Sequence, residues 1–229
     1  MQNARAGGPD VGKTLSMTRL TRWGHACVRL DRDSATLVID PGAFSALDGA
    51  LAGTTAVLVT HEHADHVDVG RVAAATRDGV DVWGPQAVVD ALAGGGAASD
   101  RLHAVRAGDT FSAGGFDVRV LGEWHALIHA DVPRVANVGY LVGSVLHPGD
   151  AYVDPQGAPV DVLLTPVGAP WLRLGEVVDY VRSVRPRQVV VVHDALLSDV
   201  GRGLAVSLLG RLGGAGDPVV LEPGDGIDL

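Results

Sequence analysis

Apolar residues occur along the chain in short runs separated by turn residues, a pattern typical of β-strands. In the first third of the chain, these runs predict strands at residues 18–21, 26–30, 36–39 and 56–60. Asp31-Arg32-Asp33 predicts a turn between the second and third strands, and Asp40-Pro41-Gly42 ends the meander. Apolar residues at helical spacing over residues 67–76 predict a short helix, so the fourth strand should run into a strand-to-helix corner.

Strands and helices alternate in the rest of the chain. Further strands are predicted at residues 102–105, 110–112, 116–121, 138–142, 145–146, 162–164, 188–192 and 218–221. Helices are predicted at residues 85–92, 176–184 and 195–212. Strands pooled in two halves, each with helices on one side, favour two sheets packed face to face with the helices outside. No linker divides the chain, so we expect one α/β domain over residues 18–229.

Composition and charge narrow the class of protein. The chain has 229 residues, 47% hydrophobic and 20% charged, which suffices for a sizeable core. Its formal net charge of -9 argues against nucleic acid as a partner, because binding a phosphate backbone needs a basic surface. The single cysteine, Cys27, cannot form an intramolecular disulfide, and no segment resembles a signal peptide or a membrane span. We therefore expect a cytoplasmic protein. The sequence leaves its oligomeric state open, and a homo-oligomer is among the options.

Residues 1–17 are polar, rich in glycine and without periodicity, and are predicted to be a flexible tail. They contain a match to the phosphate-loop pattern G-x-x-x-x-G-K-[ST] at residues 7–14. A working phosphate loop needs a buried strand before it, and the residues that precede this match do not form one. We interpret the match as accidental.

The strongest chemical signal follows the strand predicted at residues 56–60, where residues 61–66 read His-Glu-His-Ala-Asp-His. His61 and His63 alternate by two along an extended segment, so both imidazoles project from the same side, while Asp65 and His66 follow where the chain turns. A catalytic zinc typically takes three protein ligands and a water. Four ligands are too many for one such open site, so we predict that two neighbouring metal ions share them.

Further candidate ligands each follow another predicted strand, and they are His125, Asp150 and His193. His129 lies four residues after His125. A turn or loop could present either histidine, and we favour His125 as the ligand, with His129 facing the pocket. Asp40 and Asp194 are candidates to accept the free N–H of a ligating imidazole, although either could instead be a turn or helix-cap carboxylate.

Four other residues are weaker candidates. His25 could reach the site from a strand edge, but a lone histidine there is more often structural. Trp124 and Trp171 are candidate pocket walls, although buried tryptophans serve cores at least as often. Cys27 is expected to be a small core residue, not a nucleophile or a ligand.

The order of these landmarks resembles the metallo-β-lactamase superfamily, and the residues that carry the resemblance are His61-x-His63-x-Asp65-His66, His125, Asp150 and His193. Gly24-His25, Asp40-Pro41 and the compact length resemble the branch that contains ascorbate-6-phosphate lactonases. The resemblance covers about residues 18–229 and implies an αβ/βα sandwich of four layers with a dinuclear site at one edge. It implies that the first metal is held by His61, His63 and His125, and the second by Asp65, His66 and His193, with Asp150 as the bridge.

A dinuclear centre predicts a hydrolase. Two cations about 3.5–4 Å apart share a bridging water, lower its pKa and polarise the substrate's carbonyl or phosphoryl oxygen. We expect Asp65 to orient this hydroxide as a base, and His129 or a metal-bound water to help protonate the leaving group. Zinc is the leading assignment, and manganese or iron also suit the ligands. The expected substrate is a small-molecule ester, lactone or phosphoester; the alternatives are a metal- or ligand-binding module without turnover and a di-iron oxidoreductase.

Overall fold

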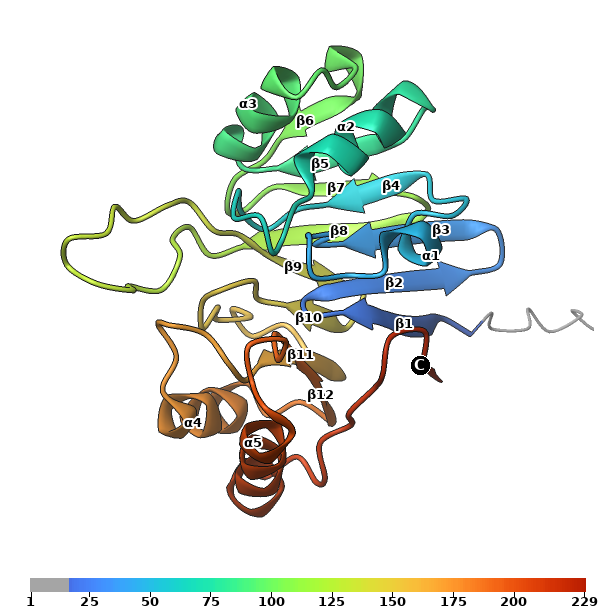
Figure 1. Ribbon diagram of the computed structural model, residues 1–229. Helices are drawn as coiled ribbons and strands as arrows, with labels where there is room; N and C mark the ends of the chain where they lie inside the picture. The colour runs from blue at the N-terminus through green and yellow to red at the C-terminus, as the bar shows by residue number, and fades with distance from the viewer. Residues whose placement is uncertain (1–16) are drawn as a thin grey trace, which may run out of the picture.

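The computed structural model describes residues 17–229 and contains two mixed β-sheets (Figure 1). The phosphate-loop match at residues 7–14 lies outside the described residues, as does the predicted tail up to residue 16. Within residues 17–229, no helix is long and apolar enough to cross a membrane.

The first sheet has seven strands in the order β13-β1-β2-β3-β4-β5-β6. These strands are β1 (Arg19–Gly24), β2 (Cys27–Arg32), β3 (Ala35–Ile39), β4 (Ala56–Leu58), β5 (Asp81–Gly84), β6 (Leu102–Ala104) and β13 (Gly226–Asp228). Pairing is antiparallel from β13 to β3 and parallel from β3 to β6. Parallel strands need crossovers, and these contain α1 (Leu47–Ala50), α2 (Val69–Arg77) and α3 (Gln86–Gly94), followed by a 3-10 turn at Ser99–Arg101.

The second sheet has six strands in the order β12-β11-β10-β9-β8-β7. These are β7 (Thr110–Ala113), β8 (Phe116–Leu121), β9 (Gly139–Val142), β10 (Val145–His147), β11 (Val162–Pro166) and β12 (Gln188–Val192). Pairing is antiparallel from β7 to β10 and parallel from β10 to β12. The crossover from β11 to β12 contains α4 (Leu174–Val184), and α5 (Asp199–Leu212) follows β12.

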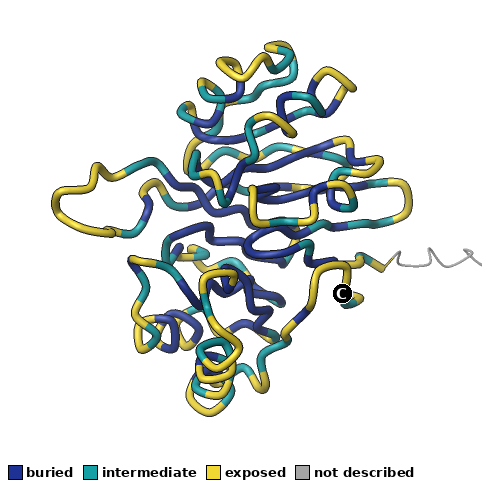
Figure 2. The backbone as a smooth tube through the Cα atoms, viewed as in Figure 1, coloured by how far each residue is buried: buried dark blue, intermediate teal, exposed yellow. Residues whose placement is uncertain are grey.

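Three apolar clusters show the layers. The central cluster joins the inner faces of the two sheets and includes Leu37, Leu58, Tyr140 and Val190. A second cluster packs α2 and α3 on the outer face of the first sheet, and a third packs α4 and α5 on the outer face of the second sheet. The buried backbone accordingly runs through the middle of the molecule, with helices above and below (Figure 2). This arrangement of helices, sheet, sheet and helices confirms the predicted αβ/βα sandwich.

The structure differs from the predicted elements at residues 218–221. The segment 218–221 is not a strand, since Val219 makes only an isolated bridge with Val190. The segment begins with Pro218, and Pro223 follows it two residues later; both lack the N–H group that a ladder needs. The chain instead ends in β13, which pairs with β1.

Two further differences concern local signals. The helix predicted at residues 195–212 begins at Asp199, because the Ser198 hydroxyl caps it by accepting a hydrogen bond from the amide of Gly201. The short strand β5 was not predicted; its four residues offer only Val82 and Trp83 as an apolar pattern.

Candidate metal centre

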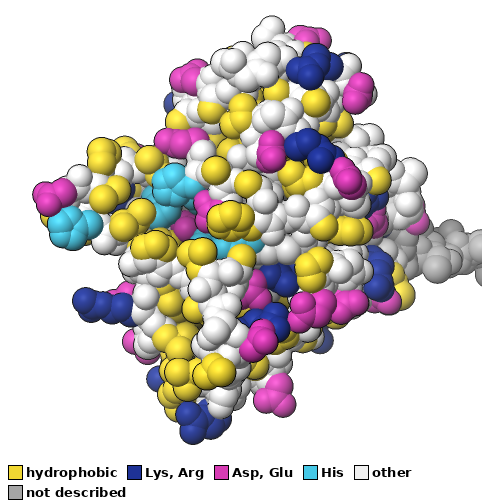
Figure 3. Space-filling view, in the orientation of Figure 1, with side chains coloured by type: hydrophobic (Ala, Val, Ile, Leu, Met, Phe, Trp, Pro, Cys, Tyr) yellow, Lys and Arg dark blue, Asp and Glu magenta, His cyan; other side chains and the backbone are white. Residues whose placement is uncertain are grey.

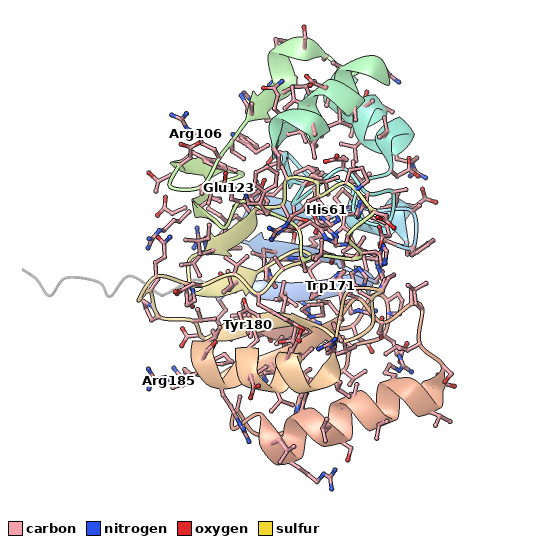
Figure 4. The ribbon with its side chains drawn as sticks, turned by 90° about the vertical axis from the view of Figure 1, so that its left-hand side faces the viewer. His61, Arg106, Glu123, Trp171, Tyr180 and Arg185 are labelled. Carbon is pink, nitrogen blue, oxygen red and sulfur yellow. The ribbon has the colours of Figure 1, made fainter. Side chains whose placement is uncertain are left out.

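The predicted ligands lie at one edge of the two sheets, at the base of a loop of residues 122–138 that projects from the molecule (Figure 1). Histidine side chains gather on the surface at this place (Figure 3). Viewed from this side, His61 of the first half of the chain lies above Trp171 of the second half (Figure 4). Both sheets contribute ligands from segments that follow a strand: His61, His63, Asp65 and His66 after β4, His125 after β8, Asp150 after β10, and His193 after β12.

The segment of residues 61–66 packs against the backbone of Gly42. A Cβ atom at Gly42 would lie 1.9 Å from the carbonyl oxygen of Asp65, so a larger residue cannot occupy this position without moving the segment. The amide of Ala43 donates a hydrogen bond of 2.8 Å to the carbonyl of Ala64. The Asp40-Pro41-Gly42 turn therefore shapes the segment that carries four of the ligands.

The first group of ligands consists of three histidines. His61 Nε2 lies 3.0 Å from His63 Nδ1, and ring nitrogens of His61, His63 and His125 all lie within 4.8 Å of one another. His125 Nδ1 donates a hydrogen bond of 2.6 Å to the carbonyl of Ala126. His61 Nδ1 lies 3.0 Å from Thr60 Oγ1. These hydrogen bonds place the ring proton of His61 and of His125 on Nδ1 and leave the Nε2 lone pair of each free to bind a metal.

Asp40 holds His66 directly and His61 through Thr60. Its Oδ2 accepts from His66 Nδ1 at 2.7 Å and from the Thr60 hydroxyl at 2.7 Å. Because the only hydroxyl proton of Thr60 goes to Asp40, its oxygen accepts the Nδ1–H of His61. The prediction that Asp40 receives the free N–H of a candidate ligand is confirmed.

The second group combines a carboxylate with histidines. Ligand atoms of His25, Asp65, His66 and His193 lie within 4.8 Å of one another. His193 Nδ1 donates a hydrogen bond of 2.7 Å to the carbonyl of Gly168, so its Nε2 is free, 3.4 Å from Asp65 Oδ2. This group lies beside the first, since the His61 and His66 ring centroids are only 4.0 Å apart.

Asp150 lies between the two groups. Its Oδ1 is 3.2 Å from the Nε2 atoms of both His66 and His193, and its Oδ2 is 3.4 Å from His125 Nε2. The indole N–H of Trp171 donates a hydrogen bond of 2.8 Å to Oδ2. A single carboxylate therefore faces ligands of both groups, as a bridging ligand would.

The donor atoms fit metal ions better than they fit one another. Four of them are buried and have no hydrogen-bond partner within residues 17–229: Nε2 of His66, His125 and His193, and Oδ1 of Asp150. Although Asp150 Oδ1 lies 3.2 Å from two of these nitrogens, the atoms lack the alignment of a hydrogen bond. Unpaired buried polar atoms are costly, and divalent cations bound to the two groups would satisfy all four.

The electrostatics of the site also favour a cation. Burial lowers the pKa of His66, but the carboxylates of Asp150 and Asp40 outweigh burial and hold that pKa well above its usual value. Burial likewise lowers the pKa of His193, but Asp150 and Asp65 outweigh it and raise the pKa to about 9. Burial raises the pKa of Asp150, but the charge of His66 outweighs it, so the carboxyl stays ionised. The carboxylates thus attract positive charge, which bound metal ions would supply.

The structure brings together all seven residues predicted as ligands: His61, His63, Asp65, His66, His125, Asp150 and His193. It does not bring His129 to them. The His129 side chain lies on the projecting loop, is 67% exposed, and has its Nδ1 3.6 Å from Asp131 Oδ2. Of the two histidines between which the sequence left a choice, His125 is the one that lies within the cluster.

Asp194 was predicted, like Asp40, to accept the N–H of a ligating imidazole. For Asp194 this prediction is wrong, because its carboxylate pairs with arginines. His193 adopts a positive φ of 57°, so the chain turns sharply before Asp194. The Asp194 carboxylate forms a buried ion pair with Arg22 on β1 and lies 3.6 Å from Arg202 on α5. Cys27, in contrast, is a buried core residue as predicted.

Sequence reasoning undervalued two residues. His25 is buried against the second group, and its Nε2 lies 3.1 Å from Asp65 Oδ2. The pair Gly24-His25 was the signal in the sequence. In the structure, Gly24 has a φ of 111° and marks an irregularity in the pairing of β1 with β2, next to His25. Trp171 was considered only as a wall or a core residue, and its hydrogen bond to Asp150 depends on two loops that meet only in the folded chain.

Fold and site together define a metal-binding αβ/βα sandwich of the metallo-β-lactamase type. A family described as "Beta-lactamase superfamily domain" matches residues 19–193. The chain belongs to this family of metallo-hydrolases, as its motif predicted.

Individual proteins show the same relationship. The chain is 37% identical to Protein Rv0786c of Mycobacterium tuberculosis over 194 residues, which cover 81% of this chain and 88% of that protein. It is 30% identical over 170 residues to a Salmonella heidelberg protein named "Probable L-ascorbate-6-phosphate lactonase UlaG", and the match covers 62% of this chain and 46% of UlaG. The expected resemblance to the lactonase-like branch is thus confirmed, although the matched region spans less than half the length of UlaG.

A solved structure shares the fold. Igni18, described as a novel metallo hydrolase from the archaeon Ignicoccus hospitalis, superposes with a TM-score of 0.72. The match covers 93% of this chain and 99% of Igni18 at 20% sequence identity. At this identity the likeness supports the fold alone.

Proposed function

We propose that the protein is a dinuclear metal-dependent hydrolase that cleaves a small-molecule ester, lactone or phosphoester. The observation that carries the proposal is Asp150, whose two oxygens face His125 of the first ligand group and His66 and His193 of the second. Bound there, two divalent ions, zinc in the leading assignment, would supply a hydroxide near neutral pH and polarise the substrate oxygen. Carboxylate and imidazole ligands also suit manganese or iron.

Asp65 is assigned a second role besides ligation. Its side chain is 23% exposed, whereas those of Asp150 and His66 are almost fully buried, so Asp65 faces the side from which substrate and water arrive. His25 and His193 lie against Oδ2, at 3.1 and 3.4 Å, so both contacts fall on one oxygen of the carboxylate. Asp65 is therefore placed to orient the attacking water and accept its proton.

His129 needs a separate test. The role proposed for it, protonation of the leaving group, requires the projecting loop to fold toward the centre, because the side chain is exposed on that loop. A His129→Ala variant that kept full turnover would assign the proton to another donor, such as a metal-bound water.

A lactone is the first substrate class to test, because the partly matched relative UlaG is named as a probable lactonase. A phosphoester stays in the proposal because the same metal chemistry activates water against a phosphoryl centre.

The experiment combines metal analysis with a substrate screen. Metal-loaded protein is expected to hold two equivalents of metal and to hydrolyse at least one member of a set of lactones, carboxylic esters, phosphomonoesters and phosphodiesters. Less than about one equivalent of tightly bound metal would overturn the proposal. His66→Ala should abolish turnover, whereas His103→Ala, which alters a histidine stacked on Trp83 in the first sheet, should not. Full metal without turnover would favour a binding module, and oxygen-dependent turnover by iron-loaded protein would favour a di-iron oxidoreductase.

A further inference from the structure

Exposed apolar side chains border the candidate metal centre. Large apolar residues are usually scattered singly on a protein surface, so a concentration of them around a site is informative. Figure 3 shows hydrophobic side chains on both sides of the histidine cluster. Exposed large apolar residues lie on the segment after β3 and on the projecting loop of residues 122–138, and they are Phe44, Trp124, Leu127, Ile128 and Val132.

The projecting loop provides the first apolar wall. Leu127, Ile128 and Val132 line one small cavity together with His63 and His125, two ligands of the first group. Leu127 is 61% exposed, so much of its side chain is available for contact with a bound molecule.

The base of this loop is fixed at the metal centre. The amide of Ala126 donates a hydrogen bond of 2.8 Å to the carbonyl of Asp150. Arg134 Nε donates one of 2.6 Å to the carbonyl of His125, and its guanidinium lies 6.0 Å from the Trp124 ring centroid. The loop's apolar side chains are therefore held next to the ligands.

Phe44 provides the second wall, on the side of the other ligand group. Its ring lies edge-on to His25 with a centroid distance of 5.4 Å, and His25 in turn contacts Asp65. Phe44 is 52% exposed. It follows Ala43, whose amide is bonded to the segment of residues 61–66, so this wall too is attached to the ligand-bearing loop.

We propose that the substrate carries an apolar group, an acyl chain or an aryl ring, next to the bond that is cleaved. In this arrangement the reacting carbon or phosphorus lies over Asp65 and Asp150, and the apolar group packs between Phe44 and the Leu127–Ile128 side of the loop. The inference rests on the proposed hydrolase function and selects a substrate class within it: apolar esters or lactones are favoured over sugar phosphates, because Phe44, Leu127 and Ile128 offer carbon surface to the substrate.

The test is a chain-length series. Metal-loaded protein is assayed with γ-lactones and with p-nitrophenyl esters whose acyl chains lengthen from acetyl to octanoyl, below their critical micelle concentrations, and with 6-phosphogluconolactone as a polar comparison. We expect kcat/KM to rise about threefold per added methylene while the chain stays within the walls. A flat or falling series, or a preference for the phosphosugar lactone, overturns the inference and leaves the proposed function intact.

Variants connect the effect to the walls. Leu127→Ser and Phe44→Ser should each reduce kcat/KM for the octanoyl ester several-fold more than for the acetyl ester. The matched control is Val200→Ser, because Val200 is 83% exposed on α5 and is not part of either wall. If Val200→Ser changed the chain-length dependence as much as Leu127→Ser, the effect would not come from the walls and the inference would fail.

A binding measurement makes the result independent of turnover. Octanoate should bind metal-loaded protein at least tenfold more tightly than acetate in calorimetry, and Leu127→Ser should remove most of the difference. Two other occupants of the walls are tested separately. Light scattering detects a second copy of the chain, and sedimentation with phosphatidylcholine vesicles detects binding to a lipid surface. Dimer formation or vesicle binding that Leu127→Ser abolishes, combined with equal affinity for octanoate and acetate, would assign the walls to a second copy or a lipid surface and overturn the inference.

Discussion

The imidazole of His25 holds the carboxylate of Asp65 through a hydrogen bond of 3.1 Å between Nε2 and Oδ2. The direction of this bond follows from the other ring nitrogen, since His25 Nδ1 accepts a hydrogen bond of 3.3 Å from the amide of Ala195. Burial lowers the pKa of His25 and keeps the ring neutral, so its one proton is on Nε2. With Nε2 donating to Asp65, His25 is a positioning residue and not a metal ligand, although it lies within the second ligand group.

The first prediction concerns this hydrogen bond. His25→Ala should weaken the affinity of the second metal about 10–100-fold, because residues that orient a ligand have effects of this size. Competition with a chromogenic zinc chelator measures both metal affinities, and His25→Gln, which keeps an N–H donor, should recover part of the loss. His103→Ala is the control, because His103 pairs with Asp81 at a distance from the centre. Unchanged affinities in His25→Ala would show that Asp65 needs no support.

The second prediction concerns Trp171, whose indole N–H is bonded to Asp150. Trp171→Phe keeps an aromatic ring beside Tyr152 but removes the donor, so the carboxylate loses one fixed contact. We expect about a tenfold loss of kcat with little change in the melting temperature. Trp83→Phe, on β5, is the matched control. An equal loss of kcat in both variants would point to a general effect of tryptophan removal on the core.

The third prediction tests the approach of Gly42 to the ligand segment. Gly42→Ala should displace the carbonyl of Asp65 and with it the ligands of residues 61–66, lowering both metal content and stability. Gly175→Ala is a suitable control, because a Cβ atom there meets nothing within 4 Å and alanine favours the first turn of α4. Metal content equal to that of the unaltered protein in Gly42→Ala would mean that the segment can shift without cost.

The sequence predicted the elements whose pattern is local and strong. Strand β12 is a run of valines covered on both faces, and strands β8 and β12 have the predicted bounds. The ligands were visible for the same reason: His61 and His63 are neighbours on one extended segment directly after a buried strand. Asp40 could be proposed as a partner because it too follows a strand, β3, which is paired with β4.

Other features depend on contacts between distant segments. The terminal strand β13 has a single apolar residue, Ile227, and exists because β1 offers an edge to pair with. Asp194 adjoins a ligand in sequence, yet Arg22 of β1 decides where its carboxylate points. In the same way, nothing near Trp171 in the sequence indicates that it meets Asp150. A pattern along the chain shows which residues can be ligands, whereas the residues that orient them are chosen by how strands from opposite ends of the chain pack.

The last prediction concerns removal of the metals. In metal-free protein, His193 has its pKa raised to about 9 from 6.5 by Asp150 and Asp65, which outweigh burial. A raised folded-state pKa contributes stability that is fully present below pH 6.5 and is lost as the pH rises through about 9. The shift corresponds to roughly 3 kcal/mol at most, and His66, shifted in the same direction, adds to it.

Metal-free protein should therefore lose stability between pH 6.5 and 9. Metal-loaded protein should change less, because bound ions replace these protons and compete with them more successfully as the pH rises. The difference in melting temperature between the two forms should widen over this range, which differential scanning calorimetry with and without a chelator can measure. His103→Ala should preserve the widening and His193→Ala should reduce it. A constant difference across the range would show that the carboxylates do not hold protons in the absence of metal.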